Sequence, residues 1–329
     1  MAVATIRDVA RLAEVSVASV SRALNGLTNV RGETRDRIFA AAAELGYVPH
    51  AGARSLSLAR AHAIGVVLPD LHGEFFSECV RGMDREASRR GYLLLLSNMH
   101  DDSEQAATAL LAMRGRVDGL LVMAPHIDPK SLERVLPPNL PAILINSADS
   151  GRPTVRFDNH AGVDAVVGHL VANGARRIVH ISGPESNLDA QERAEGFRRA
   201  LAEHAPGMEP RIIAGDFTEE AGEAAARTIL AEAERCDAIF AANDMMAIGC
   251  LHALRAAGID VPGEIAIAGF DDVPLARYLD LTTVRVAIAE IGARAVARLI
   301  DLVEGQGEEG GEVHLPKLVV RGTTRSAIA

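Results

Sequence analysis

A cluster of small hydroxyl and amide side chains surrounds one arginine near the start of the chain. Residues 16–25 read SVASVSRALN. Serine hydroxyls and asparagine amides donate hydrogen bonds to phosphate oxygens, and an arginine can bind the O6 and N7 atoms of guanine. These residue types favour contact with a nucleic acid, with Arg22 reading a base. The phosphate contacts would come from Ser16, Ser19, Ser21 and Asn25.

Two short helices joined by a tight turn would position these side chains. Thr5, followed three residues later by Asp8, is similar to a capping box, and Ser16 is a favoured residue at the start of a second helix. The apolar spacing ends the first helix near Ala13, and Asn25-Gly26 ends the second. The pattern predicts a helix-turn-helix, a motif that places its second helix in the DNA major groove.

A third helix is predicted over about residues 33–45, ending at Gly46, and residues 47–56 continue as YVPHAGARSL. Together these segments resemble the lactose/galactose repressor (LacI/GalR) family. The matching motifs are T-I-x-D-V-A-x-x-A-x-V-S-x-x-S-V-S-R-x-L-N-G and G-Y-x-P-x-x-x-A-R-S-L. The resemblance continues through the rest of the chain, and it implies a transcriptional regulator, most often a repressor, that binds a palindromic operator.

The resemblance implies roles on double-stranded operator DNA for residues of both segments. Backbone contacts are implied for Thr5, Ser16, Ser19, Ser21 and Asn25. Base reading is implied for Val17, Ala18 and Arg22. Residues 50–58 resemble a hinge helix that folds only on DNA, where Ala53 and Leu56 would contact the operator. Leu56 would act as the apolar wedge that opens one base step in the minor groove.

Three positions depart from the family pattern. Glu14 occupies a turn position that is often glycine, and a positive φ there would cost about 1 kcal/mol. Ser19 stands where threonine is common, and His50 replaces the more usual asparagine at the start of the hinge. The serine keeps its hydroxyl donor, whereas the His50 substitution affects one expected hinge contact.

The charge of the chain is distributed unevenly. The formal net charge is −10, yet residues 1–60 carry eight arginines against five acidic residues, which leaves −13 on the remainder. A basic head on an acidic body is typical of a small DNA-binding domain attached to another domain. The three cysteines are far apart and show no metal-ligand spacing, and no secretory signal or membrane-spanning run is present. We therefore expect a cytoplasmic protein that needs no metal or cofactor.

From residue 63 onward, short apolar runs of strand length alternate with amphipathic helical stretches. The runs begin near residues 63, 92, 118, 142, 177, 210, 237 and 264, and a further strand is predicted over 312–321. Near-continuous apolar strands alternating with helices predict parallel sheets covered on both faces. The predicted fold is an all-α helix-turn-helix domain followed by an α/β core of two lobes with parallel sheets. The resemblance implies a periplasmic-binding-protein-like (type I) core.

The domain boundaries follow from these patterns. Residues 1–49 are expected to form the helix-turn-helix domain, residues 50–61 the hinge, and residues 62–329 the effector-binding and dimerisation domain. The first lobe would span about residues 62–158 and 289–317. The second lobe would span about residues 159–288 and 318–329.

Polar residues follow five of the predicted strands. They are Asn146, Ser182-Gly183-Pro184, Asp216-Phe217, Asn243-Asp244 and Phe270-Asp271-Asp272. Ligands of parallel α/β sheets bind outside the carboxyl ends of the strands. Asparagine, aspartate and glycine are also common in loops that bind nothing, so any single one of these positions can be explained without a ligand. Polar residues after five separate strands, however, favour a ligand crevice.

The resemblance implies which residues bind the effector. Arg193 in Q-E-R-A-E-G-F would clamp it, Asp271 in G-F-D-D would accept hydroxyl hydrogen bonds, and Phe217 would lie against it. The remaining implied positions are Phe75, Phe76, Asn146, Asn187 and Asn243. These side chains suit a sugar. The alternative is a purine or another non-sugar corepressor, but purine-binding members would carry a second arginine where this chain has Asn187.

Two other classes of protein share parts of this pattern. A sugar-processing or nucleotide-binding enzyme could use a similar core, but no G-x-G-x-x-G follows a predicted strand, and the phosphate-loop, nucleophile-elbow and zinc motifs are absent from the sequence. A transport-type solute-binding protein would have no use for residues 1–58. We expect a non-enzymatic homodimer, because a two-fold dimer matches a palindrome and no leucine heptads follow the last strand.

Overall fold

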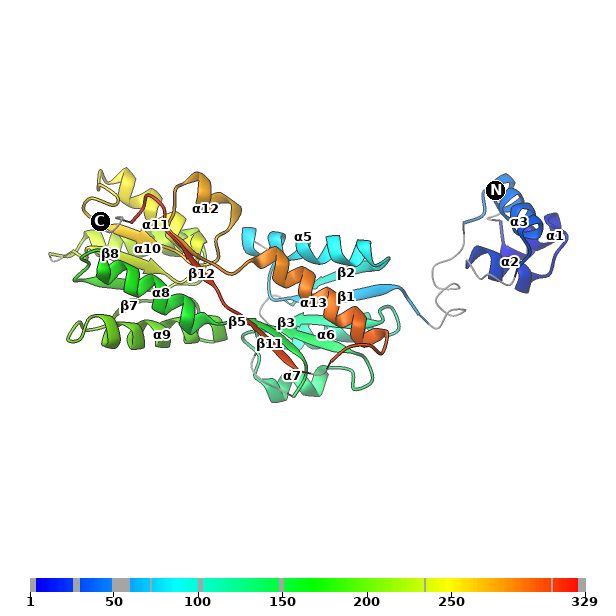
Figure 1. Cartoon of the computed structure of the whole chain (residues 1–329), viewed down its shortest axis with the longest axis horizontal. Coiled ribbons are helices and arrows are strands. Elements are labelled where there is room, and N and C mark those ends of the chain that lie inside the picture. The colour runs from blue at the N-terminus through cyan, green and yellow to red at the C-terminus, as the bar shows by residue number, and fades with distance from the viewer. Residues whose placement is uncertain are drawn as a thin grey trace. The chain divides into compact units, whose positions relative to one another are not determined.

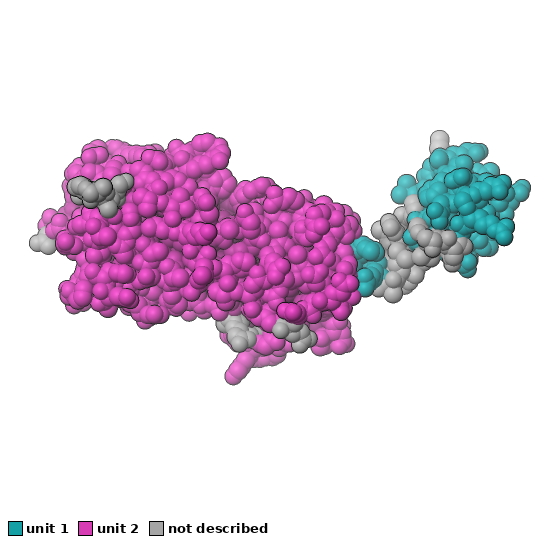
Figure 2. All heavy atoms as spheres, viewed as in Figure 1, with its two compact units in different colours: residues 1–63, 115–118 teal, residues 64–114, 119–329 magenta. Residues whose placement is uncertain are grey.

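The computed structural model describes residues 4–25, 30–48, 60–71, 73–99, 103–147, 151–233, 235–308 and 310–324. The chain divides into two compact units, which Figure 2 distinguishes by colour. The first unit comprises residues 1–63 and 115–118, and the second comprises residues 64–114 and 119–329.

Three helices build the described part of the first unit: α1 (Ile6–Leu12), α2 (Val17–Leu24) and α3 (Gly32–Glu44). Their bounds agree with the sequence prediction to within one or two residues at each described end. Val9, Val20 and Ile38, one from each helix, are completely buried in the shared core. The predicted helix-turn-helix is therefore present, with α3 packed against both of its helices.

The termini of α1 and α2 have the predicted local chemistry. The backbone N–H and the hydroxyl of Thr5 both donate to Asp8, at 3.0 and 2.6 Å, and they lower the pKa of that carboxyl. Ser16 accepts the backbone N–H of Ser19 at 3.1 Å, which caps α2. Glu14 has a φ of +54°, the left-handed conformation that favours glycine.

Residues 50–59 of the predicted hinge lie outside the described residues, and these include His50, Ala53 and Leu56. The described part of the chain resumes at Arg60. Ala61 and Ala63 then donate backbone hydrogen bonds to the carboxylate of Asp118, at 2.7 and 3.3 Å. These bonds fix the residues that lead into the first core strand.

A six-stranded sheet forms the first lobe of the second unit, with the order β11-β5-β4-β3-β1-β2. Its strands are β1 (Ala63–Leu68), β2 (Leu93–Asn98), β3 (Gly119–Met123), β4 (Ala142–Ile145), β5 (Thr154–Phe157) and β11 (Gly311–His314). The helices α5 (Glu74–Arg89) and α13 (Ile288–Val303) lie side by side against this sheet (Figure 1). The helices α6 (Ser103–Met113) and α7 (Pro129–Val135) also belong to this lobe.

A four-stranded sheet forms the second lobe, with the order β7-β6-β8-β9 and parallel pairing throughout. Its strands are β6 (Ile178–Ile181), β7 (Arg211–Ile213), β8 (Ala238–Ala241) and β9 (Ala266–Ala268). Two helix pairs cover it, α8 (Asn159–Ala172) with α9 (Leu188–His204), and α10 (Glu219–Leu230) with α11 (Asp244–Ala256). Helix α12 (Pro274–Tyr278) and the pair β10 (Thr283–Arg285) and β12 (Lys317–Val319) complete the lobe.

The chain passes between the lobes more than once. The segment from β11 to β12 connects the first sheet to the second lobe, as Figure 1 shows in red. The β5–α8 and β10–α13 connections make the other passages. Each lobe therefore contains segments that are distant in sequence, and the ends of the strands in both lobes meet at one cleft.

Four short elements were not predicted: β5, α7, β10 and α12. The predicted strands therefore account for five of the six strands of the first sheet, and β5 is the one that was missed. β5 and β10 have only four and three residues, so their apolar content does not stand out from the flanking loops. In the described part of the chain, none of the helices is long and apolar enough to cross a membrane.

Candidate functional site

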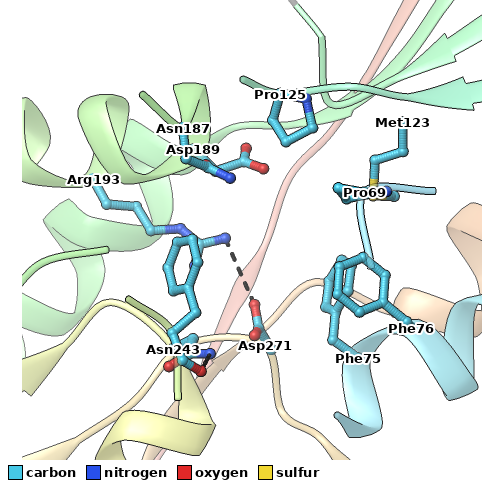
Figure 3. A pocket seen from close by; sticks show the side chains of 11 residues that line it. Pro69, Phe75, Phe76, Met123, Pro125, Asn187, Asp189, Arg193, Asn243 and Asp271 are labelled. Atoms are coloured by element: carbon cyan, nitrogen blue, oxygen red, sulfur yellow. Dashed lines mark hydrogen bonds and ion pairs between the residues drawn. The ribbon is translucent and has the colours of Figure 1, made fainter. Parts of the chain in front are cut away.

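One cavity opens at the carboxyl ends of the strands in the second unit, with about 490 Å³ not filled by protein atoms. The first lobe contributes residues that follow β1 and β3 and the first turn of α5. The second lobe contributes residues that follow β7, β8 and β9 and the first turns of α9. The cavity is lined by Pro69, Phe75, Phe76, Met123, Pro125, Asn187, Asp189, Arg193, Phe217, Asn243 and Asp271 (Figure 3).

Most of the residues expected to bind the effector line this cavity. Seven of the eight are present: Phe75, Phe76, Asn187, Arg193, Phe217, Asn243 and Asp271. Asn146 is not among the lining residues. It is buried with a φ of +46°, and its backbone N–H donates to Val155. Asn146 thus supports the loop after β4, and no hydrogen bond to its Oδ1 is present among the described residues.

Arg193 is buried on α9 and is held from several sides. Its Nε donates to Oδ1 of Asn159 at 2.9 Å, and its Nη1 donates to the carbonyl of Ala242. The guanidinium lies 3.9 Å from the ring centroid of Phe270. Stacking and hydrogen bonds together fix its plane, so the Nη2 edge is directed toward the cavity and Asp271.

Asp271 faces Arg193 across 3.6 Å, measured from Nη2 to Oδ1. Its φ of +117° is unusual for a residue with a side chain, and its backbone N–H donates to Val284 at 2.8 Å. Burial raises the pKa of Asp271 to about 7, although Arg193 acts in the opposite direction. The neighbouring Asp272 points elsewhere and accepts hydrogen bonds from Arg285 and Arg321, at 2.5 and 2.6 Å.

Sequence reasoning missed Asp189, which lies one turn before Arg193 on α9. Its Oδ1 accepts a hydrogen bond from Asn159 at 2.8 Å, and burial raises the pKa of its carboxyl. Figure 3 shows its carboxylate directed into the cavity. The i, i+4 spacing from Arg193 is the sequence signal that could have indicated it. Pro69, Met123 and Pro125 were also missed, because apolar residues at strand ends resemble ordinary core.

Aromatic rings supply much of the remaining wall. Phe75 and Phe76 contact each other edge to face, with ring centroids 5.4 Å apart. Phe217 has a φ of +73° and lies against Gly183, where an added Cβ would be 2.3 Å from its ring. Gly183 therefore lets Phe217 reach its position. The backbone carbonyl of Phe217 accepts a hydrogen bond from the side-chain amide of Asn243 at 2.9 Å.

The first unit exposes the predicted base-reading residues on one helix. Ser16, Val17, Ala18 and Arg22 of the α2 region are exposed, whereas Val20 and Ala23 face the core. Val17 has 41% of its surface exposed, which leaves this apolar side chain accessible to a base. Arg22 makes no hydrogen bond or ion pair within the described residues, so its guanidinium is available to another molecule. The described residues contain no cluster of side chains suited to hold a metal ion.

Comparisons with known proteins match both units. Residues 5–50 match the model of bacterial regulatory proteins of the lacI family, and residues 167–324 match a periplasmic binding protein-like domain. The transcriptional repressor CytR of Escherichia coli is 35% identical, over 98% of this chain and 97% of its own length. The ribose operon repressor of Halalkalibacterium halodurans is 33% identical, over 98% of this chain and 97% of its own. The chain belongs to the LacI family.

The fold of this LacI-family chain matches solved structures over nearly its whole length. The lac repressor dimer bound to operator and the anti-inducer ONPF covers 98% of this chain and 99% of its own, at 29% identity and a TM-score of 0.90. The complex of the regulator CelR with cellobiose covers 97% and 99%, at 30% identity and a TM-score of 0.70. The chain is therefore a DNA-binding transcriptional regulator, built from a helix-turn-helix domain and an effector-binding core.

Proposed function

We propose that this LacI-family chain is a repressor that binds a palindromic operator as a homodimer and is controlled by a sugar bound in the cavity between the lobes. The observation that carries the proposal is the meeting of Arg193 and Asp271 beside an aromatic wall. A planar guanidinium and a carboxylate suit vicinal hydroxyl groups, and aromatic faces suit the C–H face of a sugar ring. Among the residues that line the cavity, Arg193 is the only arginine, and Asn187 occupies the position where purine-binding members would carry a second one.

The operator would be bound by the residues of the first unit and by the hinge. Val17, Ala18 and Arg22 are assigned to bases, and Thr5, Ser16, Ser19, Ser21 and Asn25 to the DNA backbone. Ala53 and Leu56 are assigned to the minor groove. The proposed domains are residues 1–49 for DNA binding, 50–61 for the hinge and 62–329 for the effector and dimer contacts. The first lobe covers about 62–158 and 289–317, and the second about 159–288 and 318–329.

The dimer contact is placed on the edge strand β2 of the first lobe. Leu93 is 71% exposed, Leu96 is 44% exposed, and Leu111 of α6 is 61% exposed. Exposed leucines on an edge strand favour dimerisation, because the free energy falls when a second copy covers their apolar surface. Leu96→Asp should therefore shift the sedimentation mass from two chains to one. A wild-type mass near four chains would contradict the proposed dimer.

The regulatory mechanism is a coupling between the cavity and the operator-binding residues. A sugar that contacts both Phe75 and Arg193 touches both lobes, so it stabilises one relative arrangement of them. Contacts already cross the cleft: Leu188 donates its backbone N–H to Pro125 at 2.9 Å, and Leu275 donates to Glu74 at 2.9 Å. A change at the cavity then alters how the first lobes of a dimer present their hinges.

The experiment that tests this function begins with the DNA. Full-length protein is incubated with sheared DNA from its own source, and the retained fragments are sequenced. Recovery of one palindrome of about two helical turns supports the operator assignment. Titration of sugars into the complex, followed by fluorescence anisotropy, then measures the coupling. Tight binding of hypoxanthine or guanine together with no response to any sugar would overturn the sugar assignment.

A further inference from the structure

The hydrogen-bonding capacity of the cavity is uneven. Arg193 is the only basic side chain among the eleven residues that line it, and two of its nitrogens already donate to Asn159 and to the carbonyl of Ala242. Its remaining edge faces the carboxylate of Asp271. The one positive charge at the site is thus already opposed by a negative charge before any ligand arrives.

The amide side chains of the cavity are also largely committed. Asn243 accepts the backbone N–H of Met246 at 2.9 Å and donates to the carbonyl of Phe217 at 2.9 Å. Asn187 accepts the backbone N–H of Ala190 at 3.2 Å, which leaves its amide N–H groups for a ligand. Few donors therefore remain for an anionic group.

Acceptor atoms, in contrast, remain unsatisfied. Oδ1 of Asp271 is buried and accepts no hydrogen bond within the described residues. Asp189 accepts one bond at Oδ1, from Asn159, and Figure 3 shows its carboxylate turned toward the same space as that of Asp271. The negative charge of Asp189 also raises the pKa of Asp271, as expected for two carboxylates that line one cavity. Buried acceptors without donors are costly, so a ligand should supply donors.

The charged side chains beside the cavity do not offset its excess of acceptor atoms and negative charge. Glu192 lies behind Asn159 and is paired with Arg156, so this pair adds no net charge. Counting Arg193, Asp189 and Asp271, the lining carries a formal charge of −1 when both carboxyl groups are ionised. The opposite wall offers only apolar groups, from Pro69, Met123 and two phenylalanine rings.

We propose that the effector is an amino sugar, with its protonated amine held between Asp189 and Asp271 and its ring against the aromatic wall. This inference rests on the proposed function, because it concerns the same cavity and the same class of ligand. An ammonium group has three donors and no acceptor. It would complement the buried Oδ1 of Asp271, which accepts no hydrogen bond within the described residues, and the carboxylate of Asp189, which accepts one from Asn159. A sugar acid or sugar phosphate would instead bring a third negative charge to a site whose arginine is already paired.

The experiment compares matched sugars on the full-length protein by isothermal titration calorimetry at pH 7.5. The probes are two triplets: glucose, glucosamine and glucuronate, and galactose, galactosamine and galacturonate. In at least one triplet, the amine should bind ten-fold or more tightly than the neutral sugar, and the uronate should bind more weakly than both. The same order should appear in the release or retention of operator DNA.

Variants then locate the selectivity. Asp189→Asn retains the shape of the side chain and removes its charge, so the ratio of amine to neutral affinity should fall toward one. Asp84→Asn, on an exposed position of α5, removes the same charge elsewhere and should leave the ratio unchanged. Asp271→Asn should lower the affinity for both sugars, because this carboxylate also orients Arg193.

The outcomes separate the two proposals. If a neutral sugar binds as tightly as its amine and Asp189→Asn does not change the ratio, the amino-sugar inference is wrong and the sugar-responsive function stands. Tightest binding of a uronate also rejects the inference alone. If no member of either triplet binds or alters operator binding, both the inference and the proposed sugar effector are rejected.

Discussion

The guanidinium of Arg193 lies 3.6 Å from the carboxylate of Asp271 and joins α9 to the segment after β9. Both side chains are almost completely buried, so this contact is shielded from water and strengthened by the low local dielectric. Asn159 and Ala242 bind the other nitrogens of the arginine. The contact therefore supports the second lobe and also presents a charged edge to the ligand.

Arg193→Lys should test whether the support of the second lobe and the binding of the ligand depend on the shape of the guanidinium rather than on its positive charge alone. Lysine retains the positive charge but cannot donate to both Asn159 and Ala242 while it also faces Asp271. We expect the effector concentration for half-maximal response to rise at least ten-fold and the free energy of unfolding to fall by about 2 kcal/mol. Calorimetry and urea unfolding measure the two quantities. Arg198→Lys on the same helix is the control, because Arg198 is 50% exposed and 3.5 Å from Glu195. An unchanged effector response in Arg193→Lys would remove Arg193 from the site.

His180 should make the stability of the second lobe sensitive to acid. It is stacked on Phe240, with ring centroids 4.8 Å apart, and its Nδ1 donates to the carbonyl of that residue at 3.0 Å. Burial lowers the pKa of His180 from an ordinary value of 6.5 to about 4. The unfolded chain therefore binds the proton first, and stability that is complete above pH 6.5 is lost as the pH falls toward 4. The loss at pH 5 is about 2 kcal/mol.

His180→Phe should flatten this dependence. The variant loses one hydrogen bond, so at pH 7.5 it should be less stable by about 1 kcal/mol. Between pH 7 and pH 5, however, its free energy of unfolding should decrease less than that of the wild type, by about 2 kcal/mol. Urea unfolding at both pH values supplies the comparison. His252→Phe, at an exposed position, controls for the change in residue type. If the free energy of unfolding decreases equally for wild type and variant between pH 7 and pH 5, His180 has the same pKa in the folded and the unfolded chain, which would contradict the prediction.

The position of the cavity followed from the sequence because polar residues after buried strands break a simple pattern. Asn243 and Asp271 come directly after apolar runs, and parallel strands bring such residues to one edge. Asp189 did not stand out, because an acidic residue in the first turn of a helix is common and stabilises the helix dipole. Asn146 follows the same pattern as Asn243, yet it is buried in the loop after β4 and does not line the cavity.

Elements with strong periodicity were predictable, and short ones were not. α13 extends from Ile288 to Val303, and a continuous apolar face marks its whole length in the sequence. β10 has three residues and is defined by its antiparallel partner β12, a contact that no local pattern reveals. β5 was likewise missed in the six-stranded sheet, since this four-residue strand is recognisable only once it pairs with β4 and β11.

Close packing of α10 on α11 should make Gly249 sensitive to a single methyl group. A Cβ at Gly249 would lie 2.0 Å from the carbonyl oxygen of Glu219, so the two helices would have to separate. We expect Gly249→Ala to lower the free energy of unfolding by about 3 kcal/mol. The N-cap of α11 is the cavity residue Asn243, so effector affinity should fall as well. Thermal unfolding and calorimetry would record both changes.

Gly310→Ala provides the matched control for this substitution. No atom lies within 4 Å of the Cβ position at Gly310, so the same added methyl group should change stability by less than about 0.5 kcal/mol. If both variants unfold like the wild type, α10 and α11 are not held as closely as the glycine contacts indicate.

Arg22 should determine sequence preference, whereas Ser16 should determine affinity for any DNA. Arg22 is exposed and without a partner in the described residues, as a base-reading arginine must be before it meets DNA. Arg22→Ala should reduce the ratio of operator to random-DNA affinity by 10- to 100-fold, which corresponds to about 1–3 kcal/mol.

Ser16→Ala removes both a phosphate donor and the cap of α2, so it should weaken binding to every sequence alike. Arg255→Ala removes an exposed charge from α11 of the second unit and serves as the control. Anisotropy titrations on the operator and on a scrambled duplex, at equal salt, distinguish the two effects. A specificity ratio that Arg22→Ala leaves intact would assign base reading to Val17 and Ala18 or to the shape of the DNA.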